Sequence, residues 1–339
     1  MDRSKLISPT EVKLRKARII VGYPLNGGTG FHFNGAQYYN TDTGEYVFNL
    51  PAGTVLPENV TYLPLEDSMS VIFKKGITQL LRRLLLHQNI EICFIPFQTS
   101  ANTRIENYRT LYDGEYRFLS RNSFEELSGY IDQTPVQGAH NGGDFYRRAY
   151  YLFRQTPNDG ALHYFVNIIP STYTACTFAD FPEGRPVTHE NAYEFYLQSG
   201  DQTKMNTSRV YGGFYDKITG LIDWAAFDSY EANWKLTSTM APKANLGGSG
   251  STIAPGIVDE HSLGYAVRTA EMLLECGAKG FHICCENLVP DMQLAAMKTA
   301  FGISDHELGV TWHNVSSDNQ FLAAINNIVR SIMDELYIE

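Results

Sequence analysis

The stretch Ile90–Phe97 (IEICFIPF) is an almost continuous apolar run, and Leu162–Ile169 (LHYFVNII) is a second run of the same kind. Such runs, which lack polar alternation, are typical of strands buried on both faces of a parallel sheet. Stretches with helical spacing of apolar residues lie between and around them. This alternation predicts an α/β fold, with a doubly wound, mostly parallel sheet of about six strands.

The first strand of the core is predicted at residues 60–65, because a helical pattern over residues 68–88 follows it directly. Ahead of it lie a strand pattern at residues 19–23 and a hairpin pattern around the turn at 42–44 (DTG). We therefore expect residues 1–58 to form an N-terminal arm and β extension outside the core.

A long insertion interrupts the alternation at residues 173–258, which are rich in loops and aromatic side chains. A long segment of this kind in a regular fold is usually functional or a linker, and its many aromatic residues argue against a linker. We expect an insertion subdomain there, between a first part of the core at 59–172 and a second part at 259–339.

Bulk composition excludes several classes of protein. The formal net charge is −10, and no block of Lys or Arg is long enough to neutralise a run of phosphates, which argues against nucleic acid as a partner. The N-terminal residues lack the apolar region of a signal peptide, and no apolar stretch is long enough for a membrane span. A cytoplasmic location is therefore the default expectation. The five cysteines have no metal-site spacing, which indicates reduced core residues.

The segment at residues 63–71 (LPLEDSMSV) resembles the opening of the von Willebrand factor A (vWA) family, in which an apolar strand ends in Asp-x-Ser-x-Ser and a helix follows. Glu66, Ser68 and Ser70 occupy the three conserved places of that motif. Further segments follow in the family's order, so that the likeness covers residues 59–172 and 260–336. These segments are residues 90–102, 141–153, 163–172, 280–287 and 319–333.

The resemblance implies a metal-ion-dependent adhesion site, in which oxygen ligands hold Mg²⁺ and an open position accepts a carboxylate from the partner. Several ligands of that site are altered in this chain. Glu66 replaces the first Asp, Asp144 stands where the family has Thr, and Pro170, Ser171 and Thr172 stand in place of Thr-Asp-Gly. The predicted degenerate Mg²⁺ site consists of Glu66, Ser68, Ser70, Asp144 and Ser171.

A second interpretation of two of these residues is structural. Ser68 and Asp144 each stand where a predicted helix begins, and Ser and Asp are preferred N-cap residues. Capping and metal binding are compatible, so both interpretations stay open.

Other candidate motifs are weaker. Residues 26–30 (NGGTG) lack the Gly-Lys-Ser/Thr ending of a phosphate-binding loop, so we interpret them as a turn between β segments. The nine histidines show no zinc-site spacing, and no arranged pair of acid and base is recognisable. An enzyme is therefore not expected.

The function expected from these features is a non-catalytic protein–protein binding or structural assembly module of vWA type. Such a module would be part of a multi-subunit surface or filament assembly. Its partner is another protein or its own subunits, in a homo-oligomer or a larger complex. Residues 95–102 (IPFQTSAN) and the insertion resemble the tight-adherence pilus group of the family. The alternative is a carbohydrate-active or other hydrolase that uses the aromatic insertion as a substrate platform.

Overall fold

The computed structural model describes residues 14–48, 50, 54–98, 101, 116–136, 138, 140–173, 210–211, 215–216, 219–225, 227–228, 255–289, 291–300 and 310–337. Most of the predicted insertion at 173–258 lies outside these residues, so its expected subdomain stays a prediction.

The core is a five-stranded sheet in the order β10-β9-β6-β1-β5, and every neighbouring pair of strands is parallel. The interior strand β1 (Ala17–Pro24) lies between β5 and β6 and has all eight residues buried. The mostly parallel α/β fold predicted from the apolar runs is confirmed. The strands are β1 (Ala17–Pro24), β5 (Ile90–Phe97), β6 (Leu162–Ile169), β9 (Lys279–Cys284) and β10 (Val310–Asn314).

The position of β1 corrects one prediction. The strand expected at 19–23 is not part of an extension but lies between β5 and β6 in the core sheet. The reason is its composition, because ARIIVGYP is apolar on both faces, as a strand between two parallel neighbours requires.

The segment expected to open the core forms a different element. β4 (Val60–Tyr62) pairs antiparallel with β2 (Tyr38–Asn40), which also pairs antiparallel with β3 (Tyr46–Val47). Thr61 and Tyr62 of β4 are exposed, so this strand is too polar on its outer side for the centre of the core. The predicted hairpin around residues 42–44 is confirmed, but within the described residues the core sheet has five strands instead of about six.

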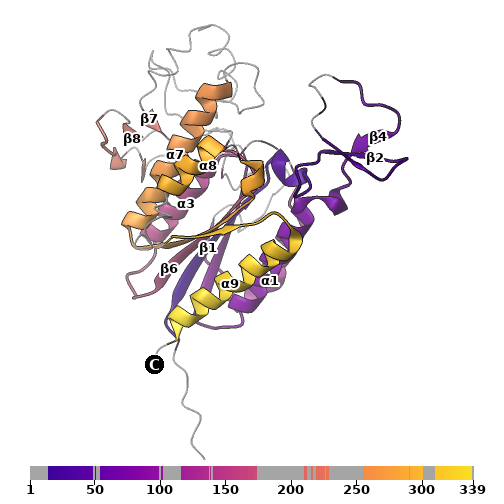
Figure 1. The fold of residues 1–339 in the computed structure, drawn as a ribbon. Coiled ribbons are helices and arrows are strands. Elements are labelled where there is room, and N and C mark those ends of the chain that lie inside the picture. The colour runs from indigo at the N-terminus through magenta and orange to yellow at the C-terminus, as the bar shows by residue number, and fades with distance from the viewer. Residues whose placement is uncertain are drawn as a thin grey trace, which may run out of the picture.

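Helices cover both faces of the sheet (Figure 1). α1 packs against α9 on one face, and α3 packs against α7 on the other. α2 lies against α1, and α8 lies against α7. The helices are α1 (Met69–Leu84), α2 (Phe124–Gln133), α3 (Gly142–Arg154), α7 (Pro255–Glu275), α8 (Asp291–Ala300) and α9 (Asp318–Leu336), with short 3-10 helices η1 (Gly27–Gly30), η2 (Leu65–Asp67), η4 (Arg121–Ser123) and η5 (Glu286–Leu288). A separate antiparallel pair is formed by β7 (Val210–Tyr211) and β8 (Tyr215–Asp216).

Close packing fixes these helices on the sheet. The rings of Phe73 on α1 and Phe321 on α9 lie 4.7 Å apart and are fully buried. Burial of each such ring contributes about 2–3 kcal/mol. On the other face, a Cβ on Gly143 of α3 would lie 2.0 Å from the ring of Tyr265 on α7, so the two helices approach closely only because this residue is a glycine.

In the described part of the chain, no helix combines the length and the apolar character that a membrane crossing needs. Four cysteines fall within the described residues and none of these four forms a disulfide. Cys93, Cys284 and Cys285 are buried, as expected for core residues, whereas Cys276 is exposed.

Candidate functional site

The candidate site is the carboxyl edge of the parallel sheet, where the loops after β1, β5 and β6 meet. Asn26 follows β1 and is only 4% exposed, and its Nδ2 donates a hydrogen bond of 3.0 Å to the Oγ of Ser171 after β6. A Cβ on Gly28 would lie 2.7 Å from the same Oγ, so the loop needs glycine there. The N–H of Gly27 donates to the carbonyl of Gly138 at 3.1 Å. Neutral hydrogen bonds thus tie the loops together.

His140 lies within this edge and is fully buried. Its ring stacks on Phe97 with centroids 5.6 Å apart, and its centroid lies 4.7 Å from that of Tyr173. The Nδ1 atom lies 3.0 Å and 3.1 Å from the carbonyl oxygens of Ser171 and Thr172, which only accept, so Nδ1 carries the proton. Burial lowers the pKa of His140 to about 4. The imidazole is therefore neutral at neutral pH and serves as a donor to the loop after β6.

Below the edge, a buried polar network joins the sheet to α3. The Oη of Tyr146 lies 2.7 Å from the Nε2 of His282 and 3.1 Å from the Oη of Tyr173. Asn167 donates from Nδ2 to Tyr146 at 2.8 Å. Burial lowers the pKa of His282 to about 3 and raises the pKa of Tyr146, so both groups are neutral. This network holds β6, β9, α3 and the edge loop in one arrangement.

The first turn of α3 carries the one charged pair near the edge among the described residues. Asp144 is fully buried, and its Oδ1 accepts from the Oη of Tyr265 at 2.9 Å and lies 3.1 Å from the Nη2 of Arg147. Its Oδ2 accepts from the N–H of Ala101 at 3.4 Å. The N-cap of α3 is Asn141, whose side chain accepts from the N–H of Asp144, so the interpretation of Asp144 as the cap is wrong.

The predicted Mg²⁺ ligands fall in different environments, and among the described residues no hydrogen bond joins any two of them. Glu66 is exposed on η2, where it lines a pocket of about 130 Å³ together with Ser68. Ser68 is buried at the N-cap position of α1, but its Oγ donates to the carbonyl of Leu65 at 2.6 Å and caps no helix N–H. Ser70 is buried in α1, and Ser171 contacts Asn26 as described above.

The residues that follow β1 are not among the ligands predicted from the sequence. These are residues 26–30 (NGGTG), which the sequence pattern favours as a turn between β segments. Asn26, Gly28 and Gly30 have the one-three-five spacing of the Asp-x-Ser-x-Ser motif and follow a strand that lies between two parallel neighbours in the core sheet. The signal for this position is the mostly apolar run that precedes them, in which Arg18 is the one charged residue.

The residues at this edge do not fit a magnesium ion. Mg²⁺ sites in proteins are usually held through one or two carboxylates. Asn26 offers one neutral buried oxygen that accepts from no described residue, Gly28 and Gly30 offer no side-chain oxygen, and Asp144 is engaged by Arg147 and Tyr265. Within the described residues, no three His, Cys, Asp or Glu side chains are grouped to hold a metal ion. The five-residue Mg²⁺ set stays a prediction.

A parallel five-stranded sheet between two helical layers, with polar loops at its carboxyl edge, is the architecture of a vWA domain, and the chain has this fold. The resemblance seen in the sequence is confirmed at the level of the fold.

Solved structures of pilus proteins share this fold. The PilB minor pilin from Streptococcus sanguinis aligns with 97% of this chain at a TM-score of 0.55 and 13% identity. The vWF domain of the type V pili tip protein Mfa5 from Porphyromonas gingivalis aligns with 96% of this chain and 98% of its own length, at a TM-score of 0.52 and 9% identity. This chain spans only 64% of the PilB chain. No protein-family model and no curated protein matches the sequence, so the similarity is one of fold.

Proposed function

We propose that this chain is a non-catalytic protein-binding and assembly module of vWA type within a multi-subunit surface or filament assembly. The proposal rests on the arm, which is defined here as the described residues 38–48, 50 and 54–65 with the strands β2, β3 and β4. These strands project from the body of the domain, away from the two helical layers (Figure 1).

The arm exposes an unusual amount of apolar surface. Tyr46, Phe48, Val55, Tyr62 and Leu65 are five of the ten exposed large hydrophobic residues among those described. Exposed apolar side chains that gather in one element mark interaction surfaces, and tyrosine is enriched at protein interfaces. A protein partner, or another copy of this chain, fits this surface.

Contacts between aromatic rings give this surface a defined shape. The ring centroids of Tyr38 and Tyr62 lie 5.2 Å apart across the β2–β4 pair, and Tyr46 of β3 contacts His32 outside the arm, with centroids 4.6 Å apart. Aromatic pairs contribute about 0.5–1.5 kcal/mol beyond area burial. A preorganised surface loses little conformational freedom on binding, which favours a docking role.

The carboxyl edge supports a non-catalytic role. The imidazole of His140 is buried and neutral and donates to two backbone carbonyls. The nearby carboxylate of Asp144 is paired with Arg147 and Tyr265. Groups held in this way are poor general acids or bases, because they cannot reach a substrate proton. The minor pilin and the pilus tip protein with the same fold suggest the type of assembly in which to search for the partner.

Site-specific photo-crosslinking in the source cell tests the proposal. A photoreactive phenylalanine analogue at Tyr62 is compared with the same analogue at Leu221, because each of these side chains is 69% exposed. We expect a discrete protein adduct from Tyr62 at several times the yield from Leu221. Equal yields at the two positions, or no adduct at Tyr62, would contradict a docking role of the arm.

A further inference from the structure

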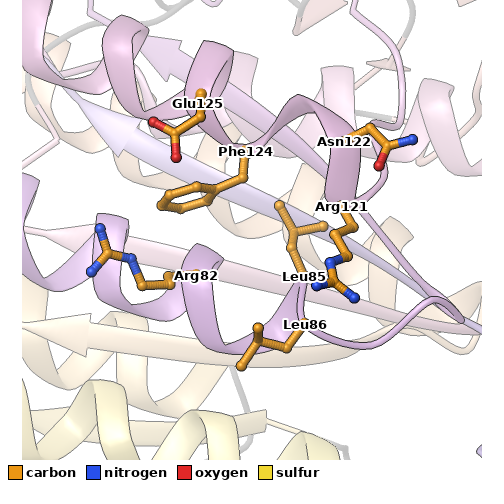
Figure 2. A pocket seen from close by; sticks show the side chains of 7 residues that line it. All are labelled: Arg82, Leu85, Leu86, Arg121, Asn122, Phe124 and Glu125. Carbon is orange, nitrogen blue, oxygen red and sulfur yellow. The ribbon is translucent and has the colours of Figure 1, made fainter.

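A second candidate surface lies far from the arm in the fold, in a shallow pocket between the end of α1 and the start of α2. Its volume is about 190 Å³. The turn after α1 lies where the two ends of the described chain meet, since Asn89 donates to the carbonyl of Leu14 at 2.6 Å and Leu14 forms a bridge with Tyr337. The pocket is lined by Arg82, Leu85, Leu86, Arg121, Asn122, Phe124 and Glu125 (Figure 2).

The pocket carries an excess of positive charge. Arg82 and Arg121 are exposed, and neither forms an ion pair with any residue that the structure describes. Glu125 is the one carboxylate among the seven lining residues, so two guanidinium groups face one negative charge. The chain as a whole carries a net charge of −10, so this local excess of positive charge runs against the balance of the molecule.

The two arginines flank an apolar floor. Figure 2 shows Phe124, Leu85 and Leu86 between Arg82 and Arg121. The guanidinium carbon of Arg82 lies 5.3 Å from the ring centroid of Phe124, a cation–π contact that holds this side chain at the rim of the pocket. Leu86 is 58% exposed, whereas Leu85 is buried beneath it.

We propose that this pocket docks a segment of a partner protein in which a Glu or Asp stands beside a bulky apolar residue. A guanidinium group binds a carboxylate through two parallel hydrogen bonds, and the apolar neighbour covers Leu86 and Phe124. Small-molecule pockets usually measure about 300–1,000 Å³, so the smaller volume here suits one or two side chains of a protein better than a free ligand.

This surface goes beyond the proposed function, because it gives the domain a second contact, near Leu14 and Tyr337, the first and last residues that the structure describes. The arm and the pocket use different residues, and each can fail without the other. The crosslinking experiment at Tyr62 therefore tests the arm alone, and peptide binding tests the pocket alone.

The test uses a capped pentapeptide, Gly-Leu-Glu-Leu-Gly, and its counterpart with Gln in place of Glu, titrated into the full chain and followed by fluorescence polarisation. We expect saturable binding of the Glu peptide that weakens as the salt concentration rises. The double variant Arg82→Gln/Arg121→Gln should weaken binding about tenfold, and Glu125→Gln should strengthen it about threefold.

The control is Arg330→Gln, which removes an exposed arginine from α9, outside the pocket. It should leave peptide affinity unchanged. The proposal is overturned if the wild-type chain shows no saturable binding of the Glu peptide, if the Gln peptide binds equally well, or if Arg330→Gln weakens binding as much as the double variant does. All variants change exposed side chains, so circular dichroism should report an intact fold.

Discussion

At the amino edge of the central sheet Arg18 lies between Asp159 and Glu91, whereas at the carboxyl edge the loop after the same strand carries the neutral amide of Asn26. Arg18 donates to the two carboxylate oxygens of Asp159 at 2.8 Å and 2.6 Å, and its Nε donates to Glu91 at 3.1 Å. Asn26 instead meets the hydroxyl of Ser171. The amino end of β1 is thus closed by full charges, and the loop after its carboxyl end is closed by neutral groups.

The difference follows from access to water. Asp159 keeps 31% of its side chain exposed, so water shares its charge, and the guanidinium of Arg18 lowers the pKa of its carboxyl group. Asn26 and Ser171 lie in a crowded edge where a carboxylate would lose its hydration. Hydrogen bonds are made at both ends of the sheet, but at the carboxyl end Asn26 and Ser171 offer no carboxylate to a metal ion, and the carboxylate of Asp144 is engaged by Arg147 and Tyr265.

The largest expected effect is on the free energy of unfolding, and it distinguishes the buried carboxylate of Asp144 from the partly exposed carboxylate of Asp159. Asp144→Ala removes a carboxylate that contacts Arg147 and Tyr265 in a fully buried setting, so we expect the free energy of unfolding to fall by about 3–5 kcal/mol. Asp159→Ala should cost clearly less, because its charge is solvated. Urea denaturation of both variants measures the difference. Equal losses would mean that the two carboxylates have the same role in stability.

The pH dependence of stability provides the next test. The imidazole of an unfolded chain takes up a proton near pH 6.5, whereas His140 in the fold stays neutral until about pH 4. Because the folded state binds fewer protons in this window, His140 should contribute a fall in stability of about 3 kcal/mol as the pH drops from 6.5 to 4. His282, whose pKa burial lowers to about 3, should add to this fall.

The matched variant is His140→Asn, which does not titrate in this range. Its free energy of unfolding should be lower than that of the wild type at pH 7.5, because the stacking on Phe97 is lost, but should vary less with pH. Chemical denaturation at several pH values gives both slopes. A variant with the same slope as the wild type would show that His140 is not the group responsible.

Much of the fold could be predicted from the sequence because the signals are local. β5 and β6 are apolar along almost their whole length, and the helical spacing of α1 and α9 marks the faces that pack on the sheet. Buried strands and amphipathic helices of this kind leave a pattern that needs no knowledge of their partners.

The position of β1 shows where local signals end. β1 and β4 are both short strands ahead of a helix, but in β1 both faces are buried, whereas β4 pairs within the arm. The sequence pattern does not show that α1 is the next long helix after β1, because 44 residues separate the two elements. The predicted Mg²⁺ site rests on the same choice of strand. Glu66, Ser68 and Ser70 follow β4, whereas the loop after β1 carries Asn26, Gly28 and Gly30.

The smallest expected effect concerns the neutral amide of Asn26, in the loop after β1. Asn26→Asp places a carboxylate at the neutral edge, and we expect it to lower the free energy of unfolding by about 1–2 kcal/mol in metal-free buffer. Millimolar Mg²⁺ should restore part of the loss in this variant and leave the wild-type melting temperature unchanged. Asn34→Asp, which adds the same charge at an exposed turn, is the control and should respond to neither condition.

A saturable rise of the wild-type melting temperature with Mg²⁺ would reverse this expectation. If Ser68→Ala abolished that rise, the metal would be bound at the start of α1, by the part of the predicted set that consists of Glu66, Ser68 and Ser70. If the rise survived Ser68→Ala but was lost in Ser171→Ala, the ion would lie between Asn26 and Ser171, at the end of β1, and the neutral hydrogen bond between these residues would have to open to admit it. The three melting curves therefore assign the metal to one of the two loops or to neither.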